Sequence, residues 1–330
     1  MRDVADLAGV SHQTVSRVLN SHPNVSPLTR ERVEKAVRQL GYRRNHAARA
    51  LATRRMMTVG VVSFAASHYG PASTLFGITE AARQAGYSVS LVTLRHIDRR
   101  AMQAALDRLT MISVDGIVVI APVVAAAAAV KGLPVGAPLV MVEAGAEQSM
   151  TSVKIDQVLG ARRATRHLLE LGHRSVWHVS GPEGWIEAEA RTAGWRAELK
   201  AAKRTFQREF VGDWSSASGF RAGREIARHR EITAVFAAND QMALGVLRAL
   251  GEEGLTVPGD VSVVGFDDVP EAGYFQPPLT TVRQDFEEIG RCCIERLLGL
   301  LHGGCPAPIR PVEPTLVIRA STGPPPSNAP

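Results

Sequence analysis

The chain of 330 residues is long enough for a small domain followed by two lobes of ordinary size. Its hydrophobic content of 45% and mean hydropathy of −0.01 are typical of a soluble globular protein, and no apolar run reaches the roughly 18 residues that span a bilayer. Arg2, Asp3 and Asp6 interrupt the apolar positions at the N-terminus, which argues against a signal peptide. We therefore expect a cytoplasmic protein with no membrane partner.

The positive charge is concentrated at the N-terminal end. Residues 1–55 hold 11 Lys/Arg and 4 Asp/Glu, a net charge of +7, so the rest of the chain carries −1 of the total of +6. A basic segment of this kind is what neutralisation of nucleic-acid phosphates requires.

The stretch 11–20, SHQTVSRVLN, is predicted to form an amphipathic helix. Its packing face, at spacings of three and four, consists of Val15, Val18 and Leu19. The opposite face carries His12, Gln13, Ser16 and Arg17. Gln pairs well with adenine edges and Arg with guanine edges, so this face is suited to reading bases in a major groove.

Two more helices are predicted beside it. The first covers residues 2–8, with Val4, Leu7 and Ala8 as its packing stripe, and Gly9-Val10-Ser11 forms a tight turn that ends in an N-cap serine. The third starts at Pro27 after the cap Ser26 and ends before Gly41. Its buried stripe comprises Val33, Ala36, Val37 and Leu40. This is the helix-turn-helix arrangement, and the local charge favours DNA binding over a three-helix unit without a partner.

Residues 45–55, NHAARALATRR, have two interpretations. Asn45 can cap a short helix rich in alanine, but two helical turns are marginal in water unless they pack against something. A flexible linker fits the residues equally well.

From Thr58 onward, apolar runs alternate with amphipathic segments. Such alternation predicts parallel sheets covered by helices on both faces. The expected strands are 58–63, 88–93, 116–121, 138–142, 175–180, 234–238 and 261–266. The expected helices are 72–85, 101–111, 161–171, 187–201, 217–228 and 240–250.

Polar side chains follow several of the predicted strands. The residues concerned are Glu143, Asn239, Asp240 and Asp267, with Arg191 on a following helix. Each alone is a common turn or cap residue, and Asp240 in particular could simply cap its helix. Ligands of parallel α/β sheets bind beyond the carboxyl ends of the strands, where these carboxylates, amide and guanidinium would suit the vicinal hydroxyls of a sugar.

Trp214 lies in the Gly/Ser-rich loop GDWSSASGF. An indole is costly to expose unless it stacks, and the apolar face of a pyranose offers such a surface. The alternative is a tryptophan folded onto the surface of its lobe.

The motifs together identify the chain as similar to the lactose-repressor (LacI/GalR) family of bacterial transcription regulators. They are DVADLAGVSHQTVSRVLN, VSPLTRERVEKAVRQLGYRRN, HLLELGH, AANDQMALG, DVSVVGFDD and PPLTTVRQDF. They occur in the family's order over nearly the whole chain, and HQTVSRV, GDWSSASGF and ANDQMALG are closest to its lactose-repressor branch.

The resemblance implies an organisation in four parts. These are a helix-turn-helix headpiece (1–44), a hinge helix and linker (45–57), a pair of Rossmann-like lobes of the periplasmic-binding-protein type (58–322) and a disordered tail (323–330). In the fold that the resemblance implies, the segment Gln284 to Leu301 returns to the first lobe. Met1 lies where the family already has helix, so we expect the natural start upstream, with a cap for the first helix.

The resemblance also implies the residues that contact double-stranded DNA. In the headpiece they are Ser11, His12, Gln13, Thr14, Ser16, Arg17, Asn20 and Thr29. In the hinge they are Asn45, Ala48 and Leu51, with Leu51 as an apolar wedge that opens the minor groove at the operator centre.

A second implied set contacts a small sugar in the cleft. It comprises Pro71, Glu143, Arg191, Trp214, Asn239, Gln241, Asp267 and Phe286. Ile120 and Ile155 depart from the lactose-repressor pattern, which has an Asn and an aromatic residue there, and these two positions bear on which sugar is bound.

We therefore expect a repressor of sugar catabolism genes that a sugar, by resemblance a galactoside, releases from a pseudo-palindromic operator. The alternatives are a corepressor-dependent or activating regulator and, less favoured, a sugar-binding transport protein. No Walker loop, GxSxG or HExxH motif indicates an enzyme. No cofactor is expected, and Cys292, Cys293 and Cys305 have neither disulfide-framework nor zinc-site spacing. The proline-rich end, TGPPPSNAP, has no heptads and therefore lacks the helix through which the lactose-repressor branch forms tetramers. A homodimer is expected instead.

Overall fold

The computed structural model describes residues 1–19, 22–42, 55–142, 152–205, 209–304 and 310–327. The chain divides into two compact units, Met1–Met56 and Met57–Pro330. The division falls at the end of the segment 45–57 predicted as hinge and linker, most of which lies outside the described residues. Within the described residues, no helix is both long and apolar enough to cross a membrane.

The first unit is a bundle of three short helices. They are α1 (Arg2–Ala8), α2 (His12–Leu19) and α3 (Pro27–Gln39). Their shared core consists of Val4, Ala5, Ala8, Val15, Val18, Val33 and Ala36. Gly9 ends α1 in the left-handed region, at φ 60°, which directs the chain into α2.

Two apolar residues predicted to be buried in this unit are exposed. Leu7 is 52% exposed, because the core-facing side of α1 runs through Val4, Ala5 and Ala8 and Leu7 lies on its flank. Leu40 is 46% exposed, because α3 ends at Gln39 and Tyr42, beyond the turn at Gly41, packs on the core instead.

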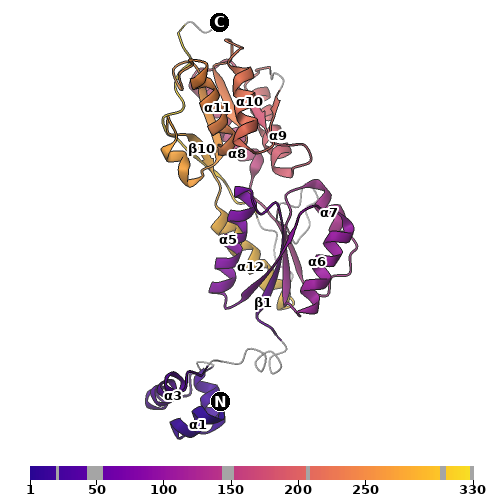
Figure 1. Ribbon diagram of the computed structural model, residues 1–330, viewed down its shortest axis with the longest axis vertical. Coiled ribbons are helices and arrows are strands. Elements are labelled where there is room, and N and C mark those ends of the chain that lie inside the picture. Colours follow the sequence, from indigo (N-terminus) through magenta and orange to yellow (C-terminus); the bar gives the residue numbers. More distant parts are fainter. Residues whose placement is uncertain (20–21, 43–54, 143–151, 206–208, 305–309, 328–330) are drawn as a thin grey trace. The chain divides into compact units, whose positions relative to one another are not determined.

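The first lobe of the second unit is built on a parallel five-stranded sheet with strand order β2-β1-β3-β4-β5. Helices α5 and α12 cover one face and α6 and α7 the other, each over its own apolar cluster (Figure 1). The elements are β1 (Thr58–Phe64), α5 (Tyr69–Gln84), β2 (Ser88–Leu94), α6 (Arg99–Met111), β3 (Gly116–Ile120), α7 (Val124–Val130), β4 (Leu139–Val142), β5 (Ser152–Val153) and α12 (Phe286–Leu301).

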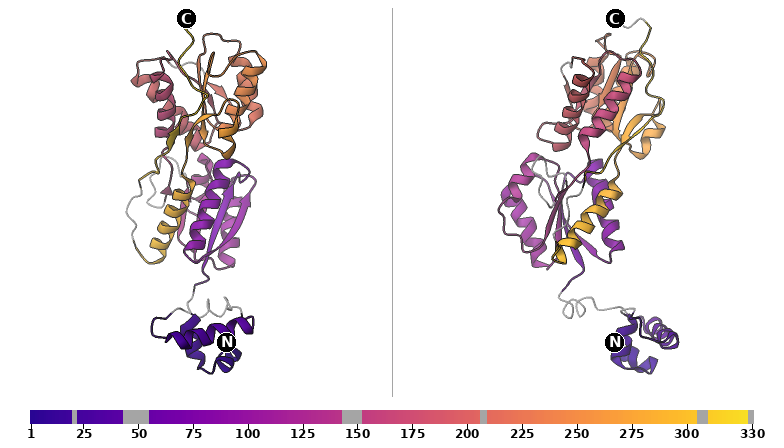
Figure 2. Two further views of the ribbon diagram at one scale, coloured as in Figure 1. Left: turned by 90° about the vertical axis from the view of Figure 1, so that its left-hand side faces the viewer. Right: turned by 180° about the vertical axis from the view of Figure 1, so that it is seen from behind.

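The second lobe has a six-stranded sheet with strand order β11-β10-β9-β8-β6-β7, parallel except for the β10–β11 pair. Helices α8 and α9 pack on one face, and α10 and α11 on the other (Figure 2). The elements are α8 (Gln157–Glu170), β6 (Trp177–Ser180), α9 (Ile186–Ala201), β7 (Phe210–Val211), α10 (Ser216–Ile226), β8 (Ala234–Ala237), α11 (Asp240–Glu252), β9 (Ser262–Asp267), the 3-10 helix η1 (Pro270–Tyr274), β10 (Thr280–Arg283) and β11 (Thr315–Val317).

The chain passes between the lobes three times: from β5 to α8, from β10 to α12, and from α12 to β11. The first and third crossings lie side by side, joined by a bridge between Ile155 and Val312. The backbone N–H of Asp156 donates to Val312 O at 2.9 Å, and that of Val312 donates to Lys154 O at 2.9 Å. The return of 284–301 to the first lobe is thus as predicted, because α12 packs beside α5.

The structure corrects the sequence prediction at several points. Helix α8 begins at Gln157, four residues early, because the Asp156 carboxylate accepts the N–H of Leu159 and caps it. The predicted disorder from 323 onward is wrong for Gly323, which is hydrogen-bonded through its backbone to His173 and Ser262. Helix α7 was not predicted, because its sequence VAAAAAV has no polar residues to mark an amphipathic period. The short strands β5, β7, β10 and β11 were not predicted either, because runs of two to four residues have no clear period.

Candidate functional site

Helix α2 presents a polar face held in place by its neighbours. Ser11 Oγ accepts the N–H of Thr14 at 3.1 Å, which caps the helix, and Val15 and Val18 anchor the opposite face in the core. Arg32 of α3 donates to Ala8 O at 2.6 Å and so braces the turn before α2. The face of α2 is therefore held by both adjacent elements.

The described DNA-contact candidates fall into two groups. Ser11, His12, Gln13 and Arg17 are exposed, whereas Thr14, Ser16 and Thr29 are half-buried. The Thr29 hydroxyl is 2.8 Å from the cap Ser26 Oγ at the start of α3. Asn20, Asn45, Ala48 and Leu51 lie outside the described residues.

In the second unit, a pocket lies between the lobes. The first lobe contributes the β1–α5 loop and the start of α5; the second contributes α9 and the ends of several strands. The lining residues are Ser67, His68, Tyr69, Gly70, Pro71, Trp185, Glu187, Arg191, Trp214, Asn239, Gln241 and Asp267.

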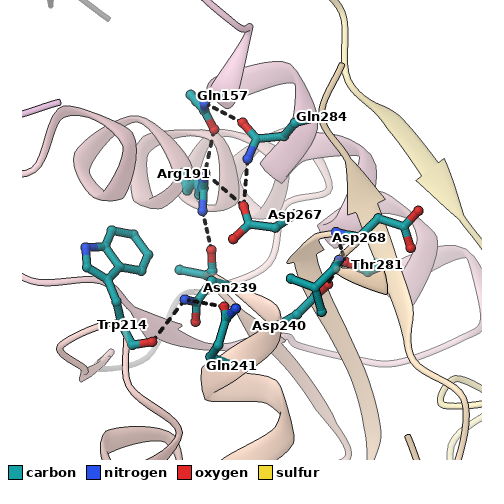
Figure 3. Close-up of polar contacts among 12 residues, drawn as sticks. Gln157, Arg191, Trp214, Asn239, Asp240, Gln241, Asp267, Asp268, Thr281 and Gln284 are labelled. Carbon is teal, nitrogen blue, oxygen red and sulfur yellow. Dashed lines mark hydrogen bonds and ion pairs between the residues drawn. The ribbon is translucent and has the colours of Figure 1, made fainter. Parts of the chain in front are cut away.

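Beneath the pocket, four side chains form a closed ring, two of which, Arg191 and Asp267, line the pocket (Figure 3). Arg191 Nε donates to Gln157 Oε1 at 2.9 Å, Gln157 Nε2 to Gln284 Oε1 at 2.8 Å, and Gln284 Nε2 to Asp267 Oδ1 at 2.6 Å. An ion pair of 3.6 Å between Arg191 Nη2 and Asp267 Oδ1 closes the ring. The guanidinium also donates to Ala238 O and lies 3.9 Å from the centre of the Phe266 ring. Arg191 is thus held on every side but that of the pocket.

Asn239 links the start of α11 to the loop that carries Trp214. Its side chain accepts the N–H of Met242 at 2.9 Å, which caps α11, and donates to Trp214 O at 3.1 Å and Gln241 Oε1 at 3.0 Å. Trp214 has φ 69°, its ring packs on Gly181, and its Nε1 has no partner among the described residues. Because Trp214 lines the pocket, the alternative of an indole outside the cleft is wrong.

Burial controls the charge of the two carboxyl groups here. Burial raises the pKa of Asp267 to about 6, against the opposing effects of Arg191 and Gln284. Burial, and then the neighbouring Asp267, raises the pKa of Asp240 well above its ordinary value. Asp267 is therefore a charged acceptor at neutral pH, facing a fixed guanidinium.

Asp240 does not cap α11, although capping was one interpretation of its place at the start of that helix. Asn239 takes that role, and Asp240 instead accepts the Thr281 hydroxyl at 2.6 Å and the N–H of Val269 at 2.9 Å. It does not line the pocket, so its part is to tie β9, β10 and α11 together beneath the site.

The lobes also touch through their main chains beside the pocket. Val124 N donates to Gly184 O at 3.0 Å, and Ile186 N donates to Pro122 O at 3.1 Å. Trp185, between the two bonds, contacts Trp214 and His68 edge-on, with ring centres 5.6 and 5.4 Å apart. This contact closes one side of the pocket.

Comparisons with known proteins match both the helix-turn-helix unit and the two-lobe unit. The family described as "Bacterial regulatory proteins, lacI family" matches residues 1–45, and "Periplasmic binding protein-like domain" matches 165–322. The lactose operon repressor of Escherichia coli (strain K12) is 36% identical over 91% of this chain and 84% of its own. The HTH-type transcriptional regulator CelR of Thermobifida fusca is 37% identical over 96% of each chain. This chain belongs to the lacI family of bacterial regulatory proteins.

Solved structures extend the match to the fold of this lacI-family chain. The lac repressor dimer bound to operator and the anti-inducer ONPF has a TM-score of 0.83 at 35% identity, covering 97% of this chain and 98% of that one. The CelR–cellobiose complex has a TM-score of 0.72 at 34% identity, again covering 97% and 98%. The predicted α/β architecture, with a helix-turn-helix unit and two parallel-sheet lobes, is confirmed.

In this lacI-family chain, six of the predicted effector residues line one pocket: Pro71, Arg191, Trp214, Asn239, Gln241 and Asp267. Phe286 does not; it lines an adjoining, more apolar cavity, which shares Pro71 and Glu187 with the pocket. Ile120 and Ile155 also line that cavity. Glu143 lies outside the described residues.

Trp185, Glu187, His68 and Tyr69 line the pocket but were not predicted. Their signal was weak, since they lie at helix starts and in a loop rather than directly after a strand. WIEAEAR does, however, place Trp185, Glu187 and Arg191 at intervals of two and four, and the helical spacing from Glu187 to Arg191 puts both on one face of α9.

Proposed function

We propose that this lacI-family regulator is a transcriptional repressor that binds a pseudo-palindromic operator as a homodimer and is released by a small sugar. The likeness to the lactose repressor supports a galactoside, and the likeness to CelR, whose solved complex contains cellobiose, supports cellobiose. The relatives are transcriptional regulators, which supports a regulator without enzymatic activity.

The polar face of α2 supports the DNA half of the proposal. His12, Gln13 and Arg17 are exposed on a helix anchored from behind, in the part of the chain that carries the excess positive charge. We propose that these three read bases while Ser11, Thr14, Ser16, Asn20 and Thr29 bind or position the backbone. The hinge residues Asn45, Ala48 and Leu51 would act at the operator centre.

The pocket carries the sugar half of the proposal. A fixed guanidinium, a carboxylate and an amide surround one indole, and together they match a pyranose ring with its vicinal hydroxyls. We propose that Arg191 and Asp267 bind neighbouring hydroxyls, with Asn239 and Gln241 beside them and Trp214 against the ring.

Release then requires that the sugar bind the released state more tightly than the operator-bound state. A roughly 1000-fold loss of operator affinity corresponds to a difference of about 4 kcal/mol. Several charge-assisted hydrogen bonds and one stacked ring are sufficient for a difference of this size.

The test is fluorescence anisotropy of a labelled DNA fragment from the region upstream of the gene. The full-length protein is titrated first, followed by lactose, methyl β-galactoside, cellobiose and ribose. We expect tight binding that one sugar reverses. Tight binding that every sugar leaves unchanged would contradict the assignment of the pocket, and sugar-strengthened binding would identify a corepressor instead.

Two variants test the DNA-binding half and the sugar-binding half of the proposal independently. Gln13→Ala should weaken binding to the fragment at least tenfold while the sugar still binds, because it removes a base contact far from the pocket in the chain. Trp214→Ala should abolish the sugar response and keep DNA binding. Trp177→Ala is the matched control, since Trp177 belongs to the same lobe and does not line the pocket.

A further inference from the structure

The ring beneath the pocket has a direction. Arg191 is a donor only and the Asp267 carboxylate an acceptor only, so each amide between them must accept on the Arg191 side and donate on the Asp267 side. The order of donors and acceptors is therefore uniquely determined, and bonds arranged head to tail polarise one another. Turning either amide over would break two hydrogen bonds among side chains that are all buried.

Burial makes this arrangement costly to disturb. Gln157 is 3% exposed, Gln284 6%, Arg191 3% and Asp267 6%. A buried polar group that loses its partner costs about 1–3 kcal/mol, more when it is charged. The four side chains must therefore change position together.

The two glutamines lie where the chain crosses between the lobes. Gln157 directly follows Asp156, whose backbone pairs with Val312 on the neighbouring crossing. Gln284 lies between β10 of the second lobe and α12, which packs in the first. The Gln157–Gln284 bond thus links all three crossings, while its outer ends hold the two charged groups of the pocket (Figure 3).

We propose that Gln157 and Gln284 are positioning residues that transmit the occupancy of the pocket to the crossings between the lobes. The inference rests on the proposed function. A sugar that takes hydrogen bonds from Arg191 and Asp267 competes with their 3.6 Å contact, the longest in the ring. Any displacement of these two groups is passed through the amides to both crossings, which changes the angle between the lobes.

The test separates transmission from simple support of the site. Gln157→Met and Gln284→Met keep the length of each side chain and remove both hydrogen bonds. For each full-length variant, operator affinity is measured without sugar and at saturating sugar, using the sugar of the panel that releases the wild-type protein. We expect the ratio of the two affinities to fall at least tenfold, with sugar-free affinity within about threefold of wild type.

A double-mutant cycle adds a second criterion. If the two residues act through their mutual hydrogen bond, Gln157→Met/Gln284→Met should lower the ratio no further than either single change. Gln103→Met is the control and should leave the ratio unchanged, because Gln103 bonds only within helix α6 of the first lobe, to Asp107. Gln157→Asn, a shorter amide, replaces the Met variant if thermal unfolding shows that the latter is not folded.

Each outcome has a definite meaning. Variants that bind sugar more weakly but show the wild-type ratio at saturation would overturn the inference and leave the proposed function intact, since the glutamines would then only support the pocket. Strictly additive effects would overturn the claim that their mutual bond carries the signal. A wild-type protein that no sugar releases would overturn the sugar half of the proposed function, and this inference with it.

Discussion

The pKa of the buried Asp267 carboxyl group lies within the range in which a change of pH can alter its charge. Its pKa is raised to about 6 because burial outweighs the attraction of Arg191 and the hydrogen bond from Gln284. The group is thus ionised at pH 7 and largely protonated at pH 5. Protonation removes an acceptor for sugar hydroxyls and weakens the attraction to Arg191.

We therefore predict that sugar affinity falls about tenfold between pH 7 and pH 5, since about nine tenths of Asp267 is protonated at the lower pH. Isothermal titration calorimetry with the releasing sugar measures the effect. Asp267→Asn should bind weakly with a flat profile. His68 also lines the pocket, so His68→Gln should retain the slope; equal wild-type affinity at both pH values would refute the role of Asp267.

Burial shifts the pKa of His178 in the opposite direction to that of Asp267. It is completely buried, stacks on Phe236 with ring centres 4.7 Å apart, and its Nδ1–H donates to Phe236 O at 2.9 Å. Burial lowers its pKa to about 4, whereas in the unfolded chain it is near 6.5. Stability that is present above pH 6.5 is therefore lost as the pH falls toward 4.

This loss should amount to about 3 kcal/mol over that interval. His178→Phe preserves the stacking and removes the titration, so its unfolding free energy should fall less between pH 6.5 and pH 4 than that of the wild type. Urea unfolding of both proteins at several pH values gives the comparison. Parallel curves would show that the imidazole does not contribute.

Helices α5 and α12 pack with their backbones in close contact. A Cβ on Gly290 would lie 2.1 Å from the backbone carbon of Gly77, and one on Gly77 would lie 2.2 Å from Phe286 O. Only glycine permits this approach, which brings the end of the β10–α12 crossing against the first lobe. The residue identity is visible in the sequence, but the reason for it is not.

Gly290→Ala should therefore destabilise the second unit by about 3 kcal/mol, because the helices must separate or their backbones shift. Gly251→Ala is the matched control, since Gly251 is also helical and a Cβ there meets nothing within 4 Å. It should stabilise the protein by about 0.5–1 kcal/mol. Thermal unfolding measures both, and a harmless Gly290→Ala would show that the contact is loose.

The arrangement of the two lobes depends on hydrogen bonds between them. The hydrogen bond from Ile186 N to Pro122 O is made at the first position of α9, where proline is tolerated because that N–H has no partner within the helix. Trp185, before it, already has an extended backbone at φ −92° and ψ 121°, as a residue preceding proline requires.

Ile186→Pro should thus remove one bond between the lobes without disturbing α9. We predict a loss of about 1 kcal/mol for the closed arrangement, seen as roughly fivefold weaker sugar binding with little change in unfolding temperature. Ser216→Pro, at the first position of α10, is the control and should bind sugar normally. Unaltered sugar affinity in Ile186→Pro would mean that the contact does not contribute to closure.

The periodicity of apolar residues was sufficient to predict most helices and strands, since it depends on which side of each element is buried. It predicted α2 with its exposed polar face, whereas the return of α12 to the first lobe was an expectation from the family resemblance. It placed Leu7 and Leu40 in the core of the headpiece, where neither lies, because a stripe on one helix does not show how far its neighbours extend. The short strands were not predicted, because two to four residues are too few to show a periodicity.

The pocket shows the same division. Residues directly after strands, such as Asn239 and Asp267, were predicted from the chain, because parallel strands end at a common edge. Their partners Gln157 and Gln284 are 127 residues apart and were not predicted, and neither were His68 and Trp185, which come from different lobes. The order of residues determined which chemistry was present, but only the folding of the three crossings decided which side chains meet, because hydrogen bonds depend on distances in space and not on separation along the chain.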